Sequence, residues 1–233
     1  LYTIAPSFRA EKSRTRRHLT EFWHAEMEIA WGGNDDVMAH GEALVRHICR
    51  TLLDERSEEL ESLGRDLDLI RRYADNPFPR IRYDEAIETL QGMGVDIEWG
   101  QDLDYSKEKV LTQDFDVPHF LTHYPRIAKP FYHRPDPDDP KYVLCHDLLA
   151  PEGYGEIIGG SQREDDLSRL QARIREEGLP EEAYLWYLDL RKYGSFPHSG
   201  FGLGIERTVA WITGRHHIRE LIPFPRMMNR IYP

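Results

Sequence analysis

The alternation of apolar and polar residues along the chain predicts a mixture of strands and helices. Residues 1–8 and 19–31 carry aromatic side chains and alternating apolar positions, which is typical of half-buried strands. The polar, basic stretch between them is too long for a tight turn, so we expect a hairpin with a basic loop. Beyond it, apolar residues recur at helical spacing and predict one long amphipathic helix over residues 36–62.

The remaining pattern continues this mixture of elements. We expect a loop at 75–81, a short helix at 82–94, strands at 116–125 and 129–151 around a Pro/Asp turn, a strand at 154–164, helices at about 164–177 and 180–194, and a glycine-rich strand that becomes a helix over 200–214. Strands and helices do not alternate as regular βαβ units. The predicted fold class is therefore α+β, with a mainly antiparallel sheet flanked by helices.

Composition narrows the possible classes of protein. The chain has 233 residues and a formal net charge of -11, which argues against a protein that simply coats nucleic acid. No stretch approaches the roughly 18–20 apolar residues of a membrane span, and the first residues lack the features of a signal peptide. Cys49 and Cys145 are far apart and form no CxxC pattern, which fits a reducing cytoplasm. Because the chain opens without Met, directly in a strand-like segment, we expect a part of a longer protein.

Positive charge is concentrated in one short segment of this acidic chain. Between residues 9 and 18 lie six basic side chains: Arg9, Lys12, Arg14, Arg16, Arg17 and His18. A solvated hairpin tip is one interpretation. However, Arg9 and Glu11 share one face of a strand, and Phe22 follows the loop as a flat aromatic. A fixed guanidinium, further basic groups and an aromatic plane are the parts needed to bind a nucleotide.

A second segment combines acidic and basic residues on strand-like stretches. Asp147 and Glu156 lie on successive predicted strands, and Arg163 follows Glu156 by seven positions within GEIIGGSQRE. One interpretation is a buried carboxylate–arginine pair that stabilises the fold. The other is a pair of carboxylates that holds a divalent cation beside phosphates, since Mg²⁺ prefers one or two carboxylates together with substrate phosphate oxygens.

A third segment, GFGLGIER, contains alternating glycines. Gly200, Gly202 and Gly204 leave one strand face bare, so that a ligand can lie against the backbone, and Arg207 follows where the strand becomes a helix. The spacing matches neither a Rossmann fingerprint nor a P-loop. With the arginine, it predicts a floor for a nucleotide.

Together, the three segments resemble the class II aminoacyl-tRNA synthetases. FRAE…RHLTEF resembles motif 2 of that family and GFGLGIER resembles motif 3. GYGEIIGGSQRE, WYLDLRKYGSFPHSGFGLGIER and IPFPR are similar to the asparaginyl subgroup rather than to the aspartyl one. The resemblance covers essentially the whole chain. It implies an ATP-dependent asparagine–tRNA ligase, which makes asparaginyl-adenylate and pyrophosphate and then charges the 3′ end of tRNA(Asn).

The resemblance also implies roles for individual residues in ATP binding. Arg9 would hold the α-phosphate and the attacking carboxylate, and Glu11 would face the adenine amino group. Arg17 and His18 would sit near the outer phosphates. The remaining residues implied at the ATP site are Phe22 under the base, Glu156, Gly204 and Arg207, which would clamp the γ-phosphate.

Other implied roles concern the metal and the amino acid. Asp147 and Glu156 would hold Mg²⁺. Arg163 would read the side-chain carbonyl of asparagine, and Glu26 would accept a hydrogen bond from its amide nitrogen. The family normally carries an anticodon-binding barrel and motif 1 before motif 2, and these do not precede Leu1. We therefore expect residues 1–233 to form the catalytic domain, from motif 2 through motif 3, of a protein that is a homodimer at full length.

Two alternatives stay open at this point. One is a synthetase paralogue that makes asparagine from aspartate, ATP and ammonia without tRNA, which the lack of an anticodon reader favours. The other is a non-catalytic module derived from a synthetase. The retention of Arg9, Glu156 and Arg207 argues against the second alternative.

Overall fold

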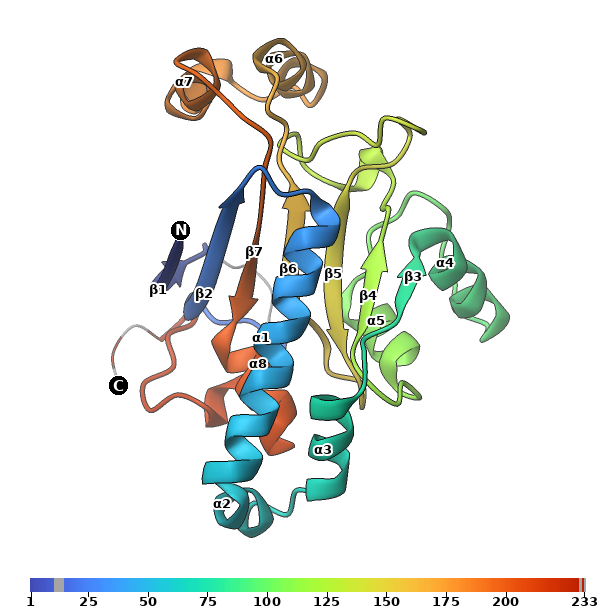
Figure 1. Ribbon diagram of the computed structural model, residues 1–233, viewed down its shortest axis with the longest axis vertical. Helices are drawn as coiled ribbons and strands as arrows, with labels where there is room; N and C mark the ends of the chain where they lie inside the picture. The colour runs from blue at the N-terminus through green and yellow to red at the C-terminus, as the bar shows by residue number, and fades with distance from the viewer. Residues whose placement is uncertain (11–14, 231, 233) are drawn as a thin grey trace.

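A single large sheet organises the molecule (Figure 1). The computed structural model describes residues 1–10, 15–230 and 232, and these form a seven-stranded sheet in the order β1-β2-β7-β6-β5-β4-β3. The strands are β1 (Tyr2–Phe8), β2 (Glu21–Ala30), β3 (Arg80–Arg82), β4 (His119–Thr122), β5 (Cys145–Ala150), β6 (Gly155–Gln162) and β7 (His198–Gly204). Within the described sheet, β3 and β4 pair in parallel and all other neighbours pair antiparallel. The predicted α+β class with a mainly antiparallel sheet is confirmed.

Helices cover this sheet and extend beyond its ends. The α-helices are α1 (Asn34–Glu55), α2 (Ser57–Ser62), α3 (Leu67–Asp75), α4 (Tyr83–Gly92), α5 (Tyr105–Thr112), α6 (Leu167–Glu176), α7 (Leu185–Lys192) and α8 (Ile205–Thr213). Short 3₁₀ turns are η1 (Arg126–Ala128), η2 (Glu181–Tyr184) and η3 (Ile218–Glu220). Helix α1 runs along one face of the sheet, and α6 and α7 lie beyond one end of the strands (Figure 1).

Apolar side chains are buried on both faces of the sheet. Phe120 of β4 belongs to the core cluster beneath α1, whereas Leu121 belongs to the cluster beneath α4 and α5. Because successive strand residues point to opposite faces, the two clusters lie on opposite sides of the sheet. The central strands are thus held rigidly between two layers, and this rigidity positions the side chains at their ends.

Two predicted elements were wrong. The helix predicted over 36–62 is two helices, because Arg56 adopts φ −139° and interrupts the helical backbone between α1 and α2. The apolar periodicity continues across this break, since Leu60 of α2 is buried in the same core as α1. The strand predicted over 129–151 is regular only in β5. Prolines at 130, 135, 137 and 140 provide no backbone N–H for a ladder, and isolated bridges replace it.

Three further elements were missed in the sequence. Helices α3 and α5 lie in segments for which we predicted no element, and β3 lies at the end of a predicted loop. Each is short, and β3 is formed only by pairing with β4. Among the described residues, none of the helices combines the length and the apolar character that are needed to cross a bilayer.

A buried histidine in β5 gives the fold a predictable dependence on pH. His146 is fully buried; its Nδ1 lies 2.7 Å from the Asn34 Oδ1 that accepts from it, and its Nε2 has no partner among the described residues. Burial, with Arg163 nearby, lowers the pKa of His146 to about 3. In the unfolded chain this imidazole titrates near its ordinary pKa of about 6.5. Below that pH the unfolded state binds one more proton than the folded state, so acid weakens folding.

We therefore expect His146→Asn, which keeps a donor near the Nδ1 position, to remove this pH dependence. Between pH 7 and pH 5, the free energy of unfolding of the wild type should fall relative to that of the variant, by up to about 1.4 kcal/mol per pH unit. Urea unfolding at several pH values measures both curves. Parallel curves would mean that His146 is protonated equally in the folded and unfolded states.

Candidate active site

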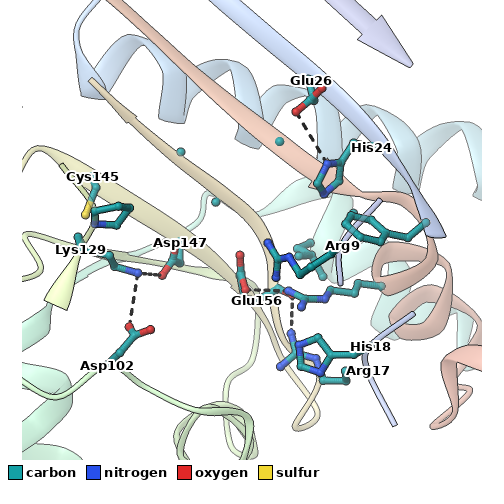
Figure 2. A pocket seen from close by; sticks show the side chains of 18 of the residues that line it. Arg9, Arg17, His18, His24, Glu26, Asp102, Lys129, Cys145, Asp147 and Glu156 are labelled. Carbon is teal, nitrogen blue, oxygen red and sulfur yellow. Dashed lines mark hydrogen bonds and ion pairs between the residues drawn. The ribbon is translucent and has the colours of Figure 1, made fainter. Parts of the chain in front are cut away.

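The three segments singled out in the sequence meet in one cavity of about 420 Å³ (Figure 2). Its walls come from Arg9 just after β1, from residues 17–19, from β2, from β5 to β7, from the start of α8 and from the segment 128–133. The residues that were predicted as site residues and line this cavity are Arg9, Arg17, His18, Phe22, Glu26, Asp147, Glu156, Arg163, Gly204 and Arg207. Glu11, predicted to face adenine, lies outside the described residues. The sheet therefore brings together segments that are up to about two hundred positions apart.

Glycines form the part of the sheet that faces the cavity. Gly159 of β6 pairs with Gly202 of β7, and both line the cavity. A Cβ atom at Gly202 would lie 3.8 Å from the Glu26 side chain. Gly200 was predicted to leave space for a ligand, but the space is filled by Glu28. A Cβ atom at Gly200 would lie 2.3 Å from the carboxyl group of Glu28. Of the three alternating glycines, Gly202 and Gly204 thus leave room in the cavity, and Gly200 makes room for Glu28.

Arg207 and Glu156 form the central ion pair of the cavity. Nη1 of Arg207 lies 2.7 Å from Oε2 of Glu156 and 3.3 Å from its carbonyl oxygen. Burial opposes ionisation of Glu156, but the guanidinium groups of Arg207 and Arg17 outweigh it and lower the pKa of this carboxyl to about 2. Glu156 is therefore a carboxylate throughout the physiological range.

Arg17 is anchored from two sides. Its Nη1 donates to Oε2 of Glu108 at 2.7 Å and its Nη2 donates to the carbonyl oxygen of Glu156 at 2.6 Å. The guanidinium also lies 4.9 Å from the ring centroid of Tyr105. His18, the next loop residue, contacts the hydroxyl of Thr15 through Nδ1. The cavity end of the basic loop is thus tied to α5 and β6.

Asp147 is paired with a lysine that was not predicted from the sequence. Nζ of Lys129 lies 3.0 Å from Oδ2 of Asp147 and 3.6 Å from Oδ1 of Asp102. Both ion pairs are drawn as dashed lines in Figure 2. Burial raises the pKa of Asp147, and the ammonium group of Lys129 opposes that rise. Lys129 also lies over the ring of Tyr124, at 3.7 Å from the centroid. No motif around Lys129 marks it, because it lies in the segment after η1 and its partner lies in β5.

The two predicted metal ligands lie close together. A Cβ atom built on Gly159 would lie 3.0 Å from Oε1 of Glu156 and 3.5 Å from Oδ1 of Asp147, so both carboxylates flank the same bare backbone position. The described residues contain no cluster of three or more His, Cys, Asp and Glu side chains that could hold a metal unaided. Two carboxylates that rely on ligand phosphates for the remaining oxygens are the donor set that suits Mg²⁺.

Arg163 is held rigidly at the opposite end of the cavity from the basic loop. Its Nε and Nη2 donate to Oε1 of Glu28 at 3.1 and 2.7 Å, and its Nη1 donates to Oγ of Ser161 at 2.8 Å. Glu28 was missed in the sequence; its position two residues after Glu26, on the same strand face, was the available signal. Oε1 of Glu26 lies 3.8 Å from Nδ1 of His24. Figure 2 shows the two side chains facing each other.

Phe22 and Arg9 complete the cavity on the side of the β1–β2 hairpin. Phe22 contacts His24 edge to face, with ring centroids 4.7 Å apart. The backbone N–H of Arg9 donates to the carbonyl of Thr20 at 2.9 Å, which continues the hairpin pairing, so Arg9 is fixed at its backbone while its side chain projects into the cavity (Figure 2). The cavity therefore has cations and an aromatic at one end and a clamped arginine at the other.

Comparison with known proteins shows the family to which the chain belongs. The family model described as "tRNA synthetases class II (D, K and N)" matches residues 1–228. Over all 233 residues, the chain is 56% identical to an asparagine–tRNA ligase from Pyrococcus abyssi, of which it covers 54%. The chain thus spans about half the length of the curated relatives it matches.

Solved structures show the same fold. The asparaginyl-tRNA synthetase of Pyrococcus horikoshii, complexed with asparaginyl-adenylate, superposes with a TM-score of 0.95 and 56% identity, over 100% of this chain and 53% of that one. The enzyme of Entamoeba histolytica, also in complex with asparaginyl-adenylate, superposes with a TM-score of 0.90 and 34% identity, over 100% of this chain and 53% of that one. Both ligands named for these structures are adenylates of asparagine.

Proposed function

Because this chain belongs to the class II tRNA synthetases of the D, K and N group, we propose that it is the catalytic part of an asparagine–tRNA ligase. In this proposal, asparagine and ATP react to form asparaginyl-adenylate and pyrophosphate. The asparaginyl group is then transferred to the 3′ end of tRNA(Asn). The observation that carries the proposal is the convergence of Arg9, Arg163 and Arg207 on one cavity, with two carboxylates between them.

ATP binds in this proposal at the end formed by the hairpin and α8. Phe22 offers a flat surface for the adenine ring, and Gly204 leaves space at the start of α8. Arg9 contacts the α-phosphate, while Arg17 and His18 face the outer phosphates. Arg207 clamps the γ-phosphate, since a guanidinium can donate to two phosphate oxygens at once.

Asparagine binds at the end that contains Arg163. The guanidinium of Arg163 is already oriented by Glu28 and Ser161, so little conformational freedom is lost when it donates to the side-chain carbonyl. Glu26 accepts from the side-chain amide nitrogen. A carboxylate at that position repels the carboxylate of aspartate, and this difference favours asparagine.

Asp147 and Glu156 are the residues that would hold Mg²⁺ when ATP is bound. The cation would supply charge neutralisation on the phosphates. In the described state, Lys129 and Arg207 balance the charge of these two carboxylates. In this proposal the side chains of Lys129 and Arg207 stay beside the phosphates, and we expect them to assist in neutralising the charge that develops there.

The chemistry requires positioning rather than a covalent nucleophile. A carboxylate oxygen of asparagine attacks the α-phosphorus of ATP, and the bond to the bridging oxygen of the β-phosphate breaks, so that pyrophosphate leaves. The 3′-terminal ribose hydroxyl of the tRNA then attacks the activated carbonyl carbon, and AMP leaves. Arg9 neutralises charge on the α-phosphate in both steps, so its contribution is electrostatic and positional.

Three further properties belong to the same proposal. The acceptor end of tRNA(Asn) is the macromolecular substrate, and the full-length protein is a homodimer. The reaction takes place in the cytoplasm, which fits the two buried free thiols Cys49 and Cys145.

Amino-acid-dependent exchange of ³²P between pyrophosphate and ATP tests the proposed function. We expect exchange with asparagine, and a kcat/KM for aspartate lower by about 10²-fold or more. Exchange with aspartate but not with asparagine would instead support a paralogue that makes asparagine from aspartate and ammonia. Exchange with neither amino acid, in a folded protein, would support a non-catalytic module.

A further inference from the structure

Glu108 of helix α5 is a buried carboxylate just behind the cavity, and no role for it was predicted from the sequence. It does not line the cavity itself. Its Oε2 accepts two hydrogen bonds, from Nη1 of Arg17 at 2.7 Å and from the backbone N–H of Glu156 at 2.9 Å. One carboxylate oxygen therefore connects the basic loop, helix α5 and strand β6.

The contacts around Glu108 form a closed ring. Arg17 donates through Nη1 to Glu108 and through Nη2 to the carbonyl oxygen of Glu156, whose own N–H donates to Glu108. The peptide of Glu156 is thus held at both its nitrogen and its oxygen. Arg17 lines the cavity, and its guanidinium has three further N–H groups besides the two used in this ring.

The backbone next to this ring is shaped to admit the carboxylate. Gly155 has φ +71°, a conformation that favours glycine. A Cβ atom at Gly155 would lie 2.3 Å from Oε2 of Glu108 and 2.9 Å from Nη1 of Arg17. Glycine is therefore required at this position by both its conformation and the space taken by the ion pair.

Burying a carboxylate is unfavourable unless it is paired and hydrogen-bonded. The Glu108 side chain is 10% exposed and that of Arg17 12% exposed, so the pair is largely shielded from solvent. Burial raises the pKa of Glu108, while Arg17 opposes that rise. Anchoring a loop does not by itself require a buried carboxylate. The unfavourable burial of Glu108 therefore indicates that the guanidinium of Arg17 has to be held in one particular place.

We propose that Glu108 is a positioning residue for the reaction: it holds Arg17 against the outer phosphates of ATP and fixes the backbone of Glu156. The inference rests on the proposed function in that ATP is the ligand of Arg17. Glu108 acts through Arg17 and makes no contact with the substrate of its own. Without it, only the carbonyl of Glu156 and the ring of Tyr105 hold the guanidinium of Arg17. Arg17 then turns away from the cavity more readily, and the affinity for ATP falls.

The variant Glu108→Gln tests this inference, because it keeps the size of the side chain and one acceptor but removes the charge. Titration calorimetry with ATP and Mg²⁺ reports binding without requiring any amino acid. We expect the Kd for ATP to rise about tenfold, because a charge-assisted hydrogen bond that orients Arg17 is lost. In exchange assays, the KM for ATP should rise similarly and the KM for asparagine should stay at the wild-type value.

Glu177→Gln is the matched control. Oε1 of Glu177 lies 2.7 Å from Nη2 of Arg173, whose side chain is 8% exposed, and neither residue lines the cavity. This variant loses a comparable ion pair and should bind ATP as the wild type does. If both variants only lowered the melting temperature and left the Kd for ATP unchanged, Glu108 would be a purely structural residue and the inference would be wrong.

A double-mutant cycle with Arg17→Ala separates action through Arg17 from any other effect. We expect Glu108→Gln to have little further effect on the Kd for ATP once Arg17 is alanine, because the residue that it positions is gone. Additive effects would overturn the inference. Should Glu108→Gln fail to fold, Glu108→Asp keeps the charge and shortens the reach; it should raise the Kd for ATP, and a wild-type value would overturn the inference.

The outcomes also distinguish this inference from the proposed function. A wild-type protein that binds ATP but performs no exchange with asparagine would contradict the function and leave the ATP titrations of the variants fully informative. Normal exchange, together with unchanged ATP binding in Glu108→Gln and Glu108→Asp, would contradict the role of Glu108 alone.

Discussion

Replacing Arg207 by alanine is expected to lower kcat/KM for asparagine-dependent ATP–pyrophosphate exchange by about 10³-fold. Arg207 lies in the first turn of α8, lines the cavity and is held by Glu156 at 2.7 Å. The variant removes a fixed cation from the place where charge develops on the leaving pyrophosphate. The loss corresponds to about 4 kcal/mol of transition-state stabilisation.

The fold of this variant should persist, because Arg207 lines the cavity and belongs to none of the apolar clusters that form the core. Circular dichroism and the melting temperature check this. Arg72→Ala is a suitable control, since Arg72 also pairs with a carboxylate, Asp116 at 3.5 Å, but on the surface away from the cavity. If folded Arg207→Ala protein had the exchange kinetics of the wild type, the assignment of Arg207 to the phosphates would be wrong.

The second large effect is expected for Arg163→Lys. We expect the kcat/KM for asparagine to fall by about 10²-fold and the discrimination against aspartate to weaken, while the KM for ATP changes little. Arg163 makes two hydrogen bonds to Glu28 and one to Ser161, which fix the plane of its guanidinium. A lysine ammonium is a compact charge and cannot reproduce this planar arrangement.

Arg134→Lys provides the matched control for Arg163→Lys. Nη1 of Arg134 lies 2.8 Å from Oδ1 of Asp165, and Arg134 does not line the cavity. Its variant should keep the wild-type KM for asparagine. Exchange rates measured over a range of asparagine and aspartate concentrations decide the matter. If Arg163→Lys kept both the wild-type KM for asparagine and the wild-type ratio of kcat/KM for asparagine to kcat/KM for aspartate, another residue would recognise the side chain of asparagine.

The parts of the fold that the sequence predicted are those in which local pattern and local structure agree. Alternating apolar positions located β2, and the glycine-rich segment located β7 and the start of α8. The prediction of one long helix over 36–62 was wrong at Arg56, because the break in the helix leaves the pattern of buried positions unchanged. The prolines of 129–144 excluded a regular ladder that the apolar pattern alone suggested.

The candidate site was predictable for residues that lie within motifs and not for their supports. Arg9, Glu156 and Arg207 stand in segments whose composition is unusual, and all three line the cavity. Glu108 and Lys129 lie in segments of ordinary composition. Arg17 and Glu108 are 91 positions apart, and Lys129 pairs with Asp147 across the cavity wall. Only the folded chain brings such partners together, so a single sequence contains no local signal for them.

Calorimetric titration with a non-hydrolysable mimic of asparaginyl-adenylate, compared with the aspartyl counterpart, tests the central claim most directly. Both mimics present the same adenosine to Phe22 and Arg9, so the difference in affinity reports only the end of the cavity that holds Arg163 and Glu26. We predict that the asparaginyl mimic binds at least about 10²-fold more tightly. Equal affinity for the two mimics, or tighter binding of the aspartyl one, would contradict the claim that this cavity selects and activates asparagine.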